Sequence, residues 1–113
     1  MPNPFPSFVD VLPEAAVSHA GVRGWVSQAA DHQVVFLHFP AGAKAAPHAH
    51  GTQWGLVVSG KLRLTIDGLA RDYGPGEWHE VPSGVVHSAE FPEETCLINV
   101  FAESDRYKTK APR

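Results

Sequence analysis

Three of the seven histidines are spaced so that their rings could lie together. His48 and His50 are two residues apart, and in an extended chain residues i and i+2 point to the same side. Imidazole nitrogens are good ligands for zinc, iron, nickel and copper. This pair therefore indicates a metal site at which two imidazoles project in the same direction.

A third imidazole comes from His87, which follows the tight turn Pro82-Ser83-Gly84 at the start of a predicted strand. Three neutral imidazoles would leave at least one coordination position for water or substrate, as a catalytic metal requires. Gln53 is a candidate fourth ligand, although simple strand alternation would turn it away from His50. It can join the histidines only if the chain bends or bulges at Gly51-Thr52.

Two further kinds of side chain are candidates for the same site. His79 lies in the short predicted strand 78–81 and is either a proton donor or general base beside the metal, or a packing residue. Trp54, Trp78 and Phe91 are either walls of a substrate pocket, since ligand cavities are mostly apolar and aromatic, or core residues. The sequence contains no nucleophile elbow, phosphate-binding loop or paired-cysteine zinc cluster.

Short strands must position these side chains, because the chain is rich in turn residues, with Gly 10 and Pro 10. Asp67-Gly68, between two apolar stretches, predicts a two-residue hairpin turn of type I′. Gly- and Ala-rich residues 40–47 are predicted to form a loop. The predicted strands are 21–28, 32–39, 53–59, 62–66, 69–73, 78–81, 85–91 and 95–102. About eight strands, one every 8–12 residues, predict an all-β antiparallel sandwich or barrel.

The chain divides into three predicted segments. Residues 1–20 form an arm whose prolines prevent a regular helix across most of it, with room for a short helical turn at 13–17. The apolar side chains of the arm predict that it packs on the barrel or on a partner subunit, and a homodimer is expected. Residues 21–103 form the barrel, and residues 104–113 form a charged tail that is ordered only in part.

Composition argues against several classes of partner. The net charge is −3 and no basic stripe occurs, so nothing predicts nucleic-acid binding. No apolar run reaches about 18 residues, so no membrane-spanning segment is predicted. Cys96 is the only cysteine, so no internal disulfide forms. The first ten residues lack the basic start of a secretory signal, and a cytoplasmic location is the default expectation.

Two glycine-framed patterns surround the three histidines. The first reads Gly42-x5-His48-x-His50-x2-Gln53-x6-Gly60, and the second reads Gly76-x5-Pro82-Ser83-Gly84-x2-His87. They resemble the two motifs of the cupin family, G-x5-H-x-H-x3,4-E-x6-G and G-x5-P-x-G-x2-H-x3-N. Gln53 stands where the family has a glutamate, after a gap one residue shorter, and Phe91 stands where it has an asparagine. The stretch His48–Gly55 matches the HxHxxQWG form of a group of small cupins.

The resemblance implies a fold and a cofactor. A small single-domain cupin is one double-stranded β-helix, or jelly-roll, barrel that holds one divalent transition metal ion. Carried onto this sequence, the ligands would be His48, His50, His87 and Gln53, and the ion would be zinc, iron, nickel or manganese. Glutamine in place of glutamate would weaken metal binding, leave the ion a stronger Lewis acid and favour an anionic substrate. Alternatively, Gln53 hydrogen-bonds a metal-bound water instead of ligating.

The expected function is that of a small metal-dependent enzyme acting on a small oxygenated metabolite. Iron would favour dioxygenase chemistry, and zinc a Lewis-acid isomerase or lyase. His79 would be the first candidate catalytic residue. The alternative is a non-catalytic cupin that binds or senses a small molecule, since a fold by itself does not determine a function.

Overall fold

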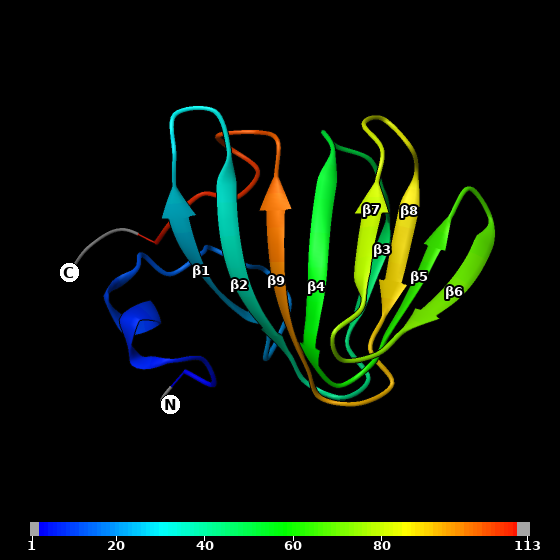
Figure 1. Cartoon of the computed structure of the whole chain (residues 1–113), viewed down its shortest axis with the longest axis horizontal. Coiled ribbons are helices and arrows are strands. Elements are labelled where there is room, and N and C mark those ends of the chain that lie inside the picture. The colour runs from blue at the N-terminus through cyan, green and yellow to red at the C-terminus, as the bar shows by residue number, and fades with distance from the viewer. Residues whose placement is uncertain (1–2, 111–113) are drawn as a thin grey trace.

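Nine strands follow one another in the computed structural model, which describes residues 3–110. They are β1 (Arg23–Gln28), β2 (Gln33–Phe39), β3 (Lys44–His48), β4 (Gln53–Ser59), β5 (Leu62–Ile66), β6 (Leu69–Tyr73), β7 (Trp78–Val81), β8 (His87–Glu90) and β9 (Thr95–Phe101). One sheet has the order β1-β2-β9-β4-β7 and the other the order β3-β8-β5-β6. All their pairings are antiparallel, and the two sheets face each other (Figure 1). The predicted all-β jelly-roll barrel is confirmed.

Alternation along each strand decides which side chains face the space between the sheets. In β4, Gln53 and Val57 are buried, whereas Trp54 and Val58 are exposed. The inward side chains of both sheets, together with Ala15 of the arm and Phe91 after β8, form the main core. Its strand residues are Val26, Val35, Leu37, Val57, Leu62, Leu64, Tyr73, Val81, Leu97 and Phe101. Polar residues at inward positions of different strands are therefore brought together inside the barrel.

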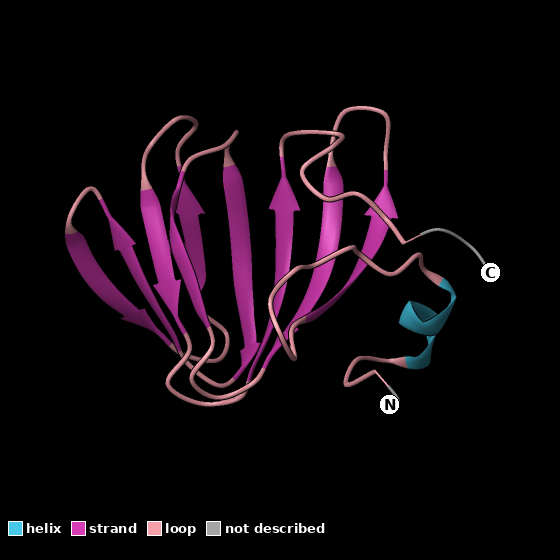
Figure 2. Ribbon diagram, turned by 180° about the vertical axis from the view of Figure 1, so that it is seen from behind, coloured by secondary structure: helices cyan, strands magenta, loops and turns pink. Residues whose placement is uncertain are grey.

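The N-terminal arm packs on the outer side of β1 and β2. The ring of Phe5 meets the rings of Trp25 and Phe36 edge-on, with centroids 6.2 Å and 5.4 Å apart. Val9 is fully buried in the same cluster and belongs to the short 3-10 helix η1 (Ser7–Val11), seen beside the sheet in Figure 2. Within residues 3–110, no helix is long and apolar enough to cross a membrane.

The helical turn expected at 13–17 is wrong, because η1 lies earlier in the arm. Glu14 and Ala15 are extended instead and form isolated β-bridges with Trp25 and Thr109. The amide of Ala15 donates to the carbonyl of Gly24 at 2.7 Å. Hydrogen bonds to neighbouring segments of the barrel replace the local bonds that a helical turn would need.

Strand β3 occupies part of the segment 40–47 that was expected to be a loop, and this expectation is wrong. Alanine and proline are weak strand formers, so the local sequence carries no strand signal. The pairing with β8 makes it a strand, with Lys44 opposite Glu90, Ala45 opposite Ala89, and His48 opposite His87. The register shifts between Ala45 and His48, around Pro47, which has no amide proton to donate.

The turn predicted at Asp67-Gly68 is confirmed. Its two residues have φ values of 50° and 82°, as a type I′ hairpin requires, and they join β5 to β6. Gly60, which closes the first of the two sequence patterns, has a φ of 88°. A side chain there would also collide with the carbonyl of Glu94, so both the backbone and the available space require glycine.

Candidate metal centre

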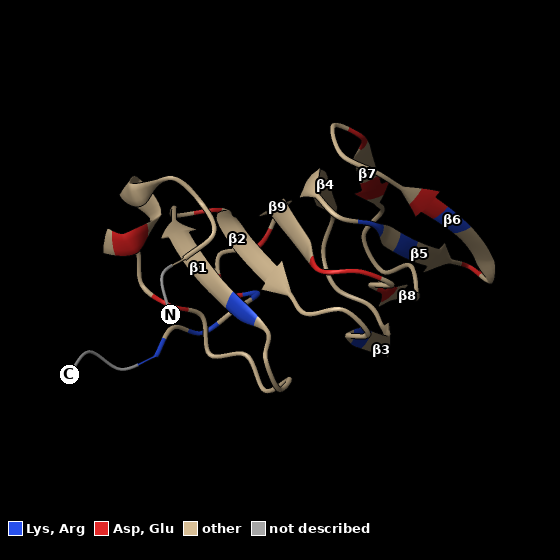
Figure 3. Cartoon of the chain, turned by 90° about the horizontal axis from the view of Figure 1, so that it is seen from below, with Lys and Arg blue, Asp and Glu red and all other residues tan. Residues whose placement is uncertain are grey.

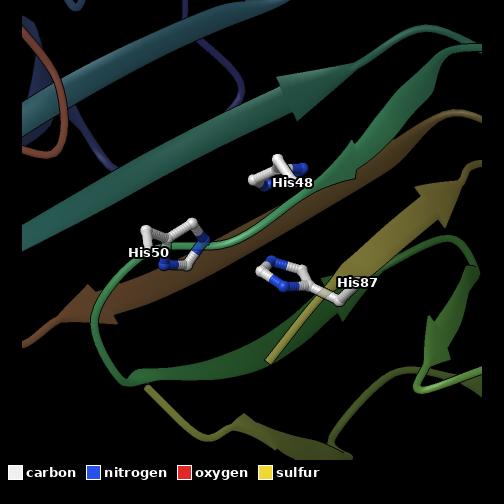
Figure 4. Close-up of side chains that lie close together, drawn as sticks. All are labelled: His48, His50 and His87. Carbon is white, nitrogen blue, oxygen red and sulfur yellow. The ribbon is translucent and has the colours of Figure 1, made fainter. Parts of the chain in front are cut away.

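The rings of His48, His50 and His87 converge between the sheets. His48 ends β3 and lies directly opposite His87, the first residue of β8, while His50 follows in the loop toward β4. One ring nitrogen of each histidine lies within 4.8 Å of the others. Figure 4 shows the three rings turned toward one another. The fold thus brings together the three histidines that the sequence singled out.

The main chain decides which nitrogen of each ring faces the centre. Each Nδ1 lies at hydrogen-bond distance from a nearby carbonyl oxygen: His48 from Ala46 at 2.7 Å, His50 from Gly51 at 2.7 Å, and His87 from Val85 at 3.0 Å. A carbonyl oxygen can only accept, so Nδ1 must carry the proton and donate it. In a neutral imidazole this leaves the lone pair on Nε2, ready to bind a metal.

Burial favours the neutral form of these rings. It is the main cause of the lowered pKa of His50 and of His87, against which the hydrogen bonds to Gly51 and Val85 raise the pKa, and the charge of Arg106 lowers it further. The Nε2 atom of His50 is enclosed and has no hydrogen-bond partner within residues 3–110. A buried acceptor left unpaired costs about 1–3 kcal/mol, which a bound cation would remove. Three neutral imidazoles therefore fit a first-row transition metal.

Gln53 lies beside the histidines because the chain bends at Gly51. Without such a bend, strand alternation would turn Gln53 away from His50. The Gln53 side chain is buried and lines the same cavity. The Nε2 atom of Gln53 lies 3.2 Å from the Nε2 atom of His79. An amide nitrogen only donates, so His79 accepts through Nε2 and carries its proton on Nδ1. This bond leaves the amide oxygen of Gln53 for a cation.

His79 is buried on β7, with 4% of its surface exposed. Burial lowers the pKa of His79 to about 4, and the charge of His87 is a second cause. The ring is therefore neutral near neutral pH, where it does not act as a charged proton donor. Its contact with Gln53 fixes the direction of that amide group inside the cavity.

Asn99 is a buried polar residue that was not among the sequence candidates. It lies on β9 opposite Gly55 of β4, where a side chain would overlap both the His79 ring and the Asn99 oxygen. The Asn99 Oδ1 and His79 Nδ1 atoms are both buried with no partner in the described part of the chain. An asparagine at an inward position of an apolar strand was the signal that could have found it.

A cavity of about 650 Å³ opens beside the histidines. Its apolar lining consists mainly of Leu37, Phe39, Leu62, Leu64, Ala89, Phe91, Leu97 and Phe101. Phe91 stacks on Phe39, with ring centroids 3.8 Å apart. Trp54 and Trp78 are not brought to this cavity, since they are 41% and 62% exposed on the outward side of β4 and β7. Each is next in sequence to an inward residue, and alternation turns it the other way.

The segment after β9 also reaches the site. Glu103 accepts a hydrogen bond from the Gly51 amide at 2.5 Å and lies 3.9 Å from the Nδ1 atom of His50. Arg106 and Tyr107 line the cavity. The sequence carried no signal for these contacts, because a charged segment without hydrophobic periodicity is typical of a solvated tail.

Comparison with known proteins identifies related folds. A family model described as the cupin domain matches residues 35–101, more than half of the chain. None of the curated proteins matches the chain. The structure of KdgF from a Halomonas species is similar at 26% sequence identity and a TM-score of 0.73, covering 81% of this chain and 88% of that one.

Two further solved structures are similar. An RmlC-like cupin from Shewanella frigidimarina shares 26% identity at a TM-score of 0.75, covering 83% of this chain and 86% of that one. Salicylate 1,2-dioxygenase from Pseudoaminobacter salicylatoxidans, with gentisate adducts, shares 18% identity at a TM-score of 0.70. That match covers 77% of this chain and 26% of the dioxygenase, and it shows the fold alone.

Proposed function

The chain belongs to the cupin domain family, and we propose that it is a metal-dependent enzyme that acts on a small oxygenated metabolite at His48, His50 and His87. The observation that carries the proposal is the cluster of three rings whose ligand nitrogens lie within 4.8 Å of one another, each with its Nδ1 atom at hydrogen-bond distance from a carbonyl, which leaves the lone pair on Nε2. Gln53 would be the fourth ligand, through its amide oxygen. A bound zinc, iron, nickel or manganese ion would supply dioxygenase chemistry or Lewis acidity for an isomerase or lyase.

The chain's own side chains would bind and orient the substrate. Aromatic and aliphatic residues such as Phe91 and Leu64 would hold its apolar part and exclude water. His79 would hold the amide of Gln53 in place and, being neutral, add no charge. All four proposed ligands are uncharged, so an anionic group on the substrate is the natural counter-charge to a divalent ion.

Non-catalytic capture or sensing of a small metabolite is a second candidate function. The observation in its favour is the lining of the cavity, which includes no aspartate or glutamate from residues 3–110 to act as a general base. A binding protein would hold the metal and the metabolite without changing either. Turnover of the bound metabolite, followed by mass spectrometry, separates an enzyme from a binding protein.

Metal content tests the proposed centre. Elemental mass spectrometry of the untagged protein should find one equivalent of a transition metal per chain. His48→Ala and His87→Ala should each abolish it, because each removes one of three converging lone pairs. Gln53→Leu should weaken zinc binding about tenfold or more, because it removes a polar group that would hold the ion or its surroundings.

His32→Ala is the matched control, since the side chain of His32 is 45% exposed and lies outside the cavity lining. It should leave the metal content unchanged. A wild-type protein that is free of metal and also refuses added Zn²⁺, Fe²⁺, Mn²⁺ and Ni²⁺ would contradict the proposal. Iron in the purified protein would direct the next assay to oxygen uptake, and zinc, nickel or manganese would direct it to isomerase and lyase screens.

We also propose that the protein forms a homodimer. Three large apolar side chains are exposed on the outward side of the five-stranded sheet: Trp54, Val58 and Trp78. A patch of exposed apolar side chains on one face of a sheet is typical of an interface between subunits. The cytoplasmic location stays a prediction.

A further inference from the structure

The charged side chains that line the cavity all have the same sign. They are Lys44, Arg106 and Lys108, and no carboxylate from residues 3–110 joins them. The chain as a whole carries 12 acidic and 9 basic residues, so its overall composition does not explain why only basic side chains are among the charged residues of the lining. A cation-lined cavity with apolar walls favours an organic anion.

Arg106 is the cation best placed to meet such an anion. Its guanidinium lies over the ring of Tyr107 at 4.5 Å and that of Phe101 at 5.4 Å. The ring of Phe101 in turn meets the ring of His50 at 5.5 Å. The guanidinium therefore packs on two aromatic rings, one of which also contacts a histidine of the candidate metal centre.

In the described part of the chain, the contacts of the Arg106 guanidinium are with aromatic rings and not with carboxylates. Its Nε atom is enclosed and lacks a hydrogen-bond acceptor, and no carboxylate forms an ion pair with it. Lys44 differs, because it lies 3.9 Å from Glu90 and is largely exposed. An enclosed donor on a cation is costly when unpaired, which favours a ligand that supplies an acceptor.

The backbone around Arg106 is held firmly. Gln33, which is 1% exposed, donates to the carbonyl of Tyr107 and accepts from its amide, both at 2.9 Å. The carbonyl of Lys108 accepts from the amide of Ala16 at 2.8 Å. In Figure 2 the segment after β9 runs back across the five-stranded sheet toward the arm. Arg106 thus belongs to a fixed wall of the barrel.

The positive charge of Arg106 also lies near the histidines. Phe101 contacts both the guanidinium of Arg106, at 5.4 Å, and the ring of His50, at 5.5 Å. Glu103 lies 3.9 Å from the Nδ1 atom of His50 but outside the cavity lining, so the cavity itself keeps an excess of positive charge. A divalent ion would add to this positive charge, so both the cavity lining and the ion would favour a substrate with a negative group.

We propose that Arg106 binds a carboxylate of the substrate, so that the cavity selects small carboxylic acids whose apolar body lies against the Phe39–Phe91 stack. This assignment of a substrate class rests on the proposed function for where the reacting end lies, toward His48, His50 and His87. The planar fork of arginine matches a carboxylate with two parallel hydrogen bonds, which makes Arg106 a specificity-determining residue. A lysine cannot reproduce that geometry.

Binding of benzoate tests the assignment, with benzamide as an uncharged probe of the same shape. NMR titration of metal-free and zinc-loaded protein should show benzoate shifting signals of the cavity lining, with benzamide at least tenfold weaker. Arg106→Met should weaken benzoate about tenfold or more and bring it close to benzamide, because a hydrogen-bonded charge is lost while the stem remains. Arg106→Lys should fall between wild type and Arg106→Met.

Arg71→Met is the matched control. Arg71 also stacks on a tyrosine, with its guanidinium 4.8 Å from the ring centre of Tyr73. It lies on β6, which carries both acidic and basic residues in Figure 3, and it is outside the cavity lining. This variant should bind benzoate like wild type. A native-like amide spectrum and an unchanged melting temperature establish that each variant is folded.

Three results would overturn the assignment. One is equal binding of benzoate and benzamide to wild type, or no benzoate binding in either metal state. Another is unchanged benzoate binding in Arg106→Met. The third is inorganic phosphate binding more tightly than benzoate, which would make the site a phosphate site. These readouts do not depend on metal content, so a protein that binds benzoate through Arg106 but no metal would contradict the proposed function alone.

Discussion

The histidines of the candidate metal centre are oriented by carbonyls one or two positions away in the chain. His48 donates to Ala46, two residues earlier, and His50 donates to Gly51, the next residue. His87 likewise donates to a carbonyl two residues earlier. Because these partners are so near in sequence, the local backbone selects the Nε2 lone pairs before any ion binds. A preorganised ligand set of this kind loses little conformational freedom on binding.

Burial of His79 predicts that the metal-free protein loses stability in mild acid. The pKa of His79 is about 4, against an ordinary value of 6.5. The unfolded chain therefore takes up a proton that the folded chain refuses, so the free energy of unfolding falls as the pH drops from about 6.5 toward 4. The expected loss from His79 is about 3 kcal/mol. Urea unfolding with a chelator present, between about pH 7 and pH 4.5, measures it.

His79→Gln removes the titrating ring and should make that fall shallower. A smaller dependence should remain, because burial also lowers the pKa of His50 and His87. Equal slopes for wild type and His79→Gln would show that burial of this ring does not govern the response to acid.

Among the elements, β4 has to pass close to two partners at once. It pairs with β7 and with β9, so Gly55 has His79 opposite on one side and Asn99 opposite on the other. A side chain at this position would overlap both. Because Gly55 has no side chain, His79 and Gln53 can approach each other on neighbouring strands.

Gly55→Ala should therefore destabilise the protein by about 1–3 kcal/mol, as overpacking of a well-filled interior does. It should also lower the affinity for zinc, because the His79 ring must move away from Gln53. Thermal unfolding and a zinc competition titration measure the two effects. Combining the change with His79→Ala should recover part of the lost stability, since the ring that collides is gone.

Gly74→Ala is the matched control for this element. A side chain at Gly74 would meet only Glu77, at an ordinary contact distance of 3.7 Å. Its effect on stability should stay within about 0.5 kcal/mol. Similar losses for both alanine variants would mean that the close approach at Gly55 is not the cause.

For the whole molecule, the two halves of the outer face of the five-stranded sheet differ in what covers them. The arm covers the outer side of β1 and β2 through Phe5 and Val9. Over β4 and β7 the outer side carries the exposed Trp54 and Trp78 instead. Within one chain, then, part of the sheet is covered and part presents apolar surface.

If a second copy of the 12.2 kDa chain covers that surface, the protein should be a dimer in solution. Trp78→Lys should convert it to a monomer, because a large aromatic side chain contributes strongly to an interface and a charge there is costly. Light scattering after size-exclusion chromatography gives the mass. Leu69→Lys is the control, since Leu69 is 78% exposed on β6 in the other sheet and should leave the dimer intact. A monomeric wild type would contradict the expectation.

Features that depend on short-range pattern were accessible from the sequence. Alternation and turn residues predicted the strands now labelled β4 to β7, and Asp67-Gly68 predicted its hairpin, because period and turn chemistry act over a few residues. The spacing of His48, His50 and His87 predicted three imidazoles at one place, which the fold brings within 4.8 Å. The cupin resemblance rested on these same local patterns.

Features that depend on long-range pairing were decided only by the tertiary structure. Strand β3 exists because β8 supplies its hydrogen bonds, and its alanines and proline carry no strand signal of their own. Arg106 faces the cavity because Gln33, on a strand distant in sequence, holds the backbone of Tyr107. Neither contact has a local period, since each depends on which strands become neighbours once the two sheets have closed on each other.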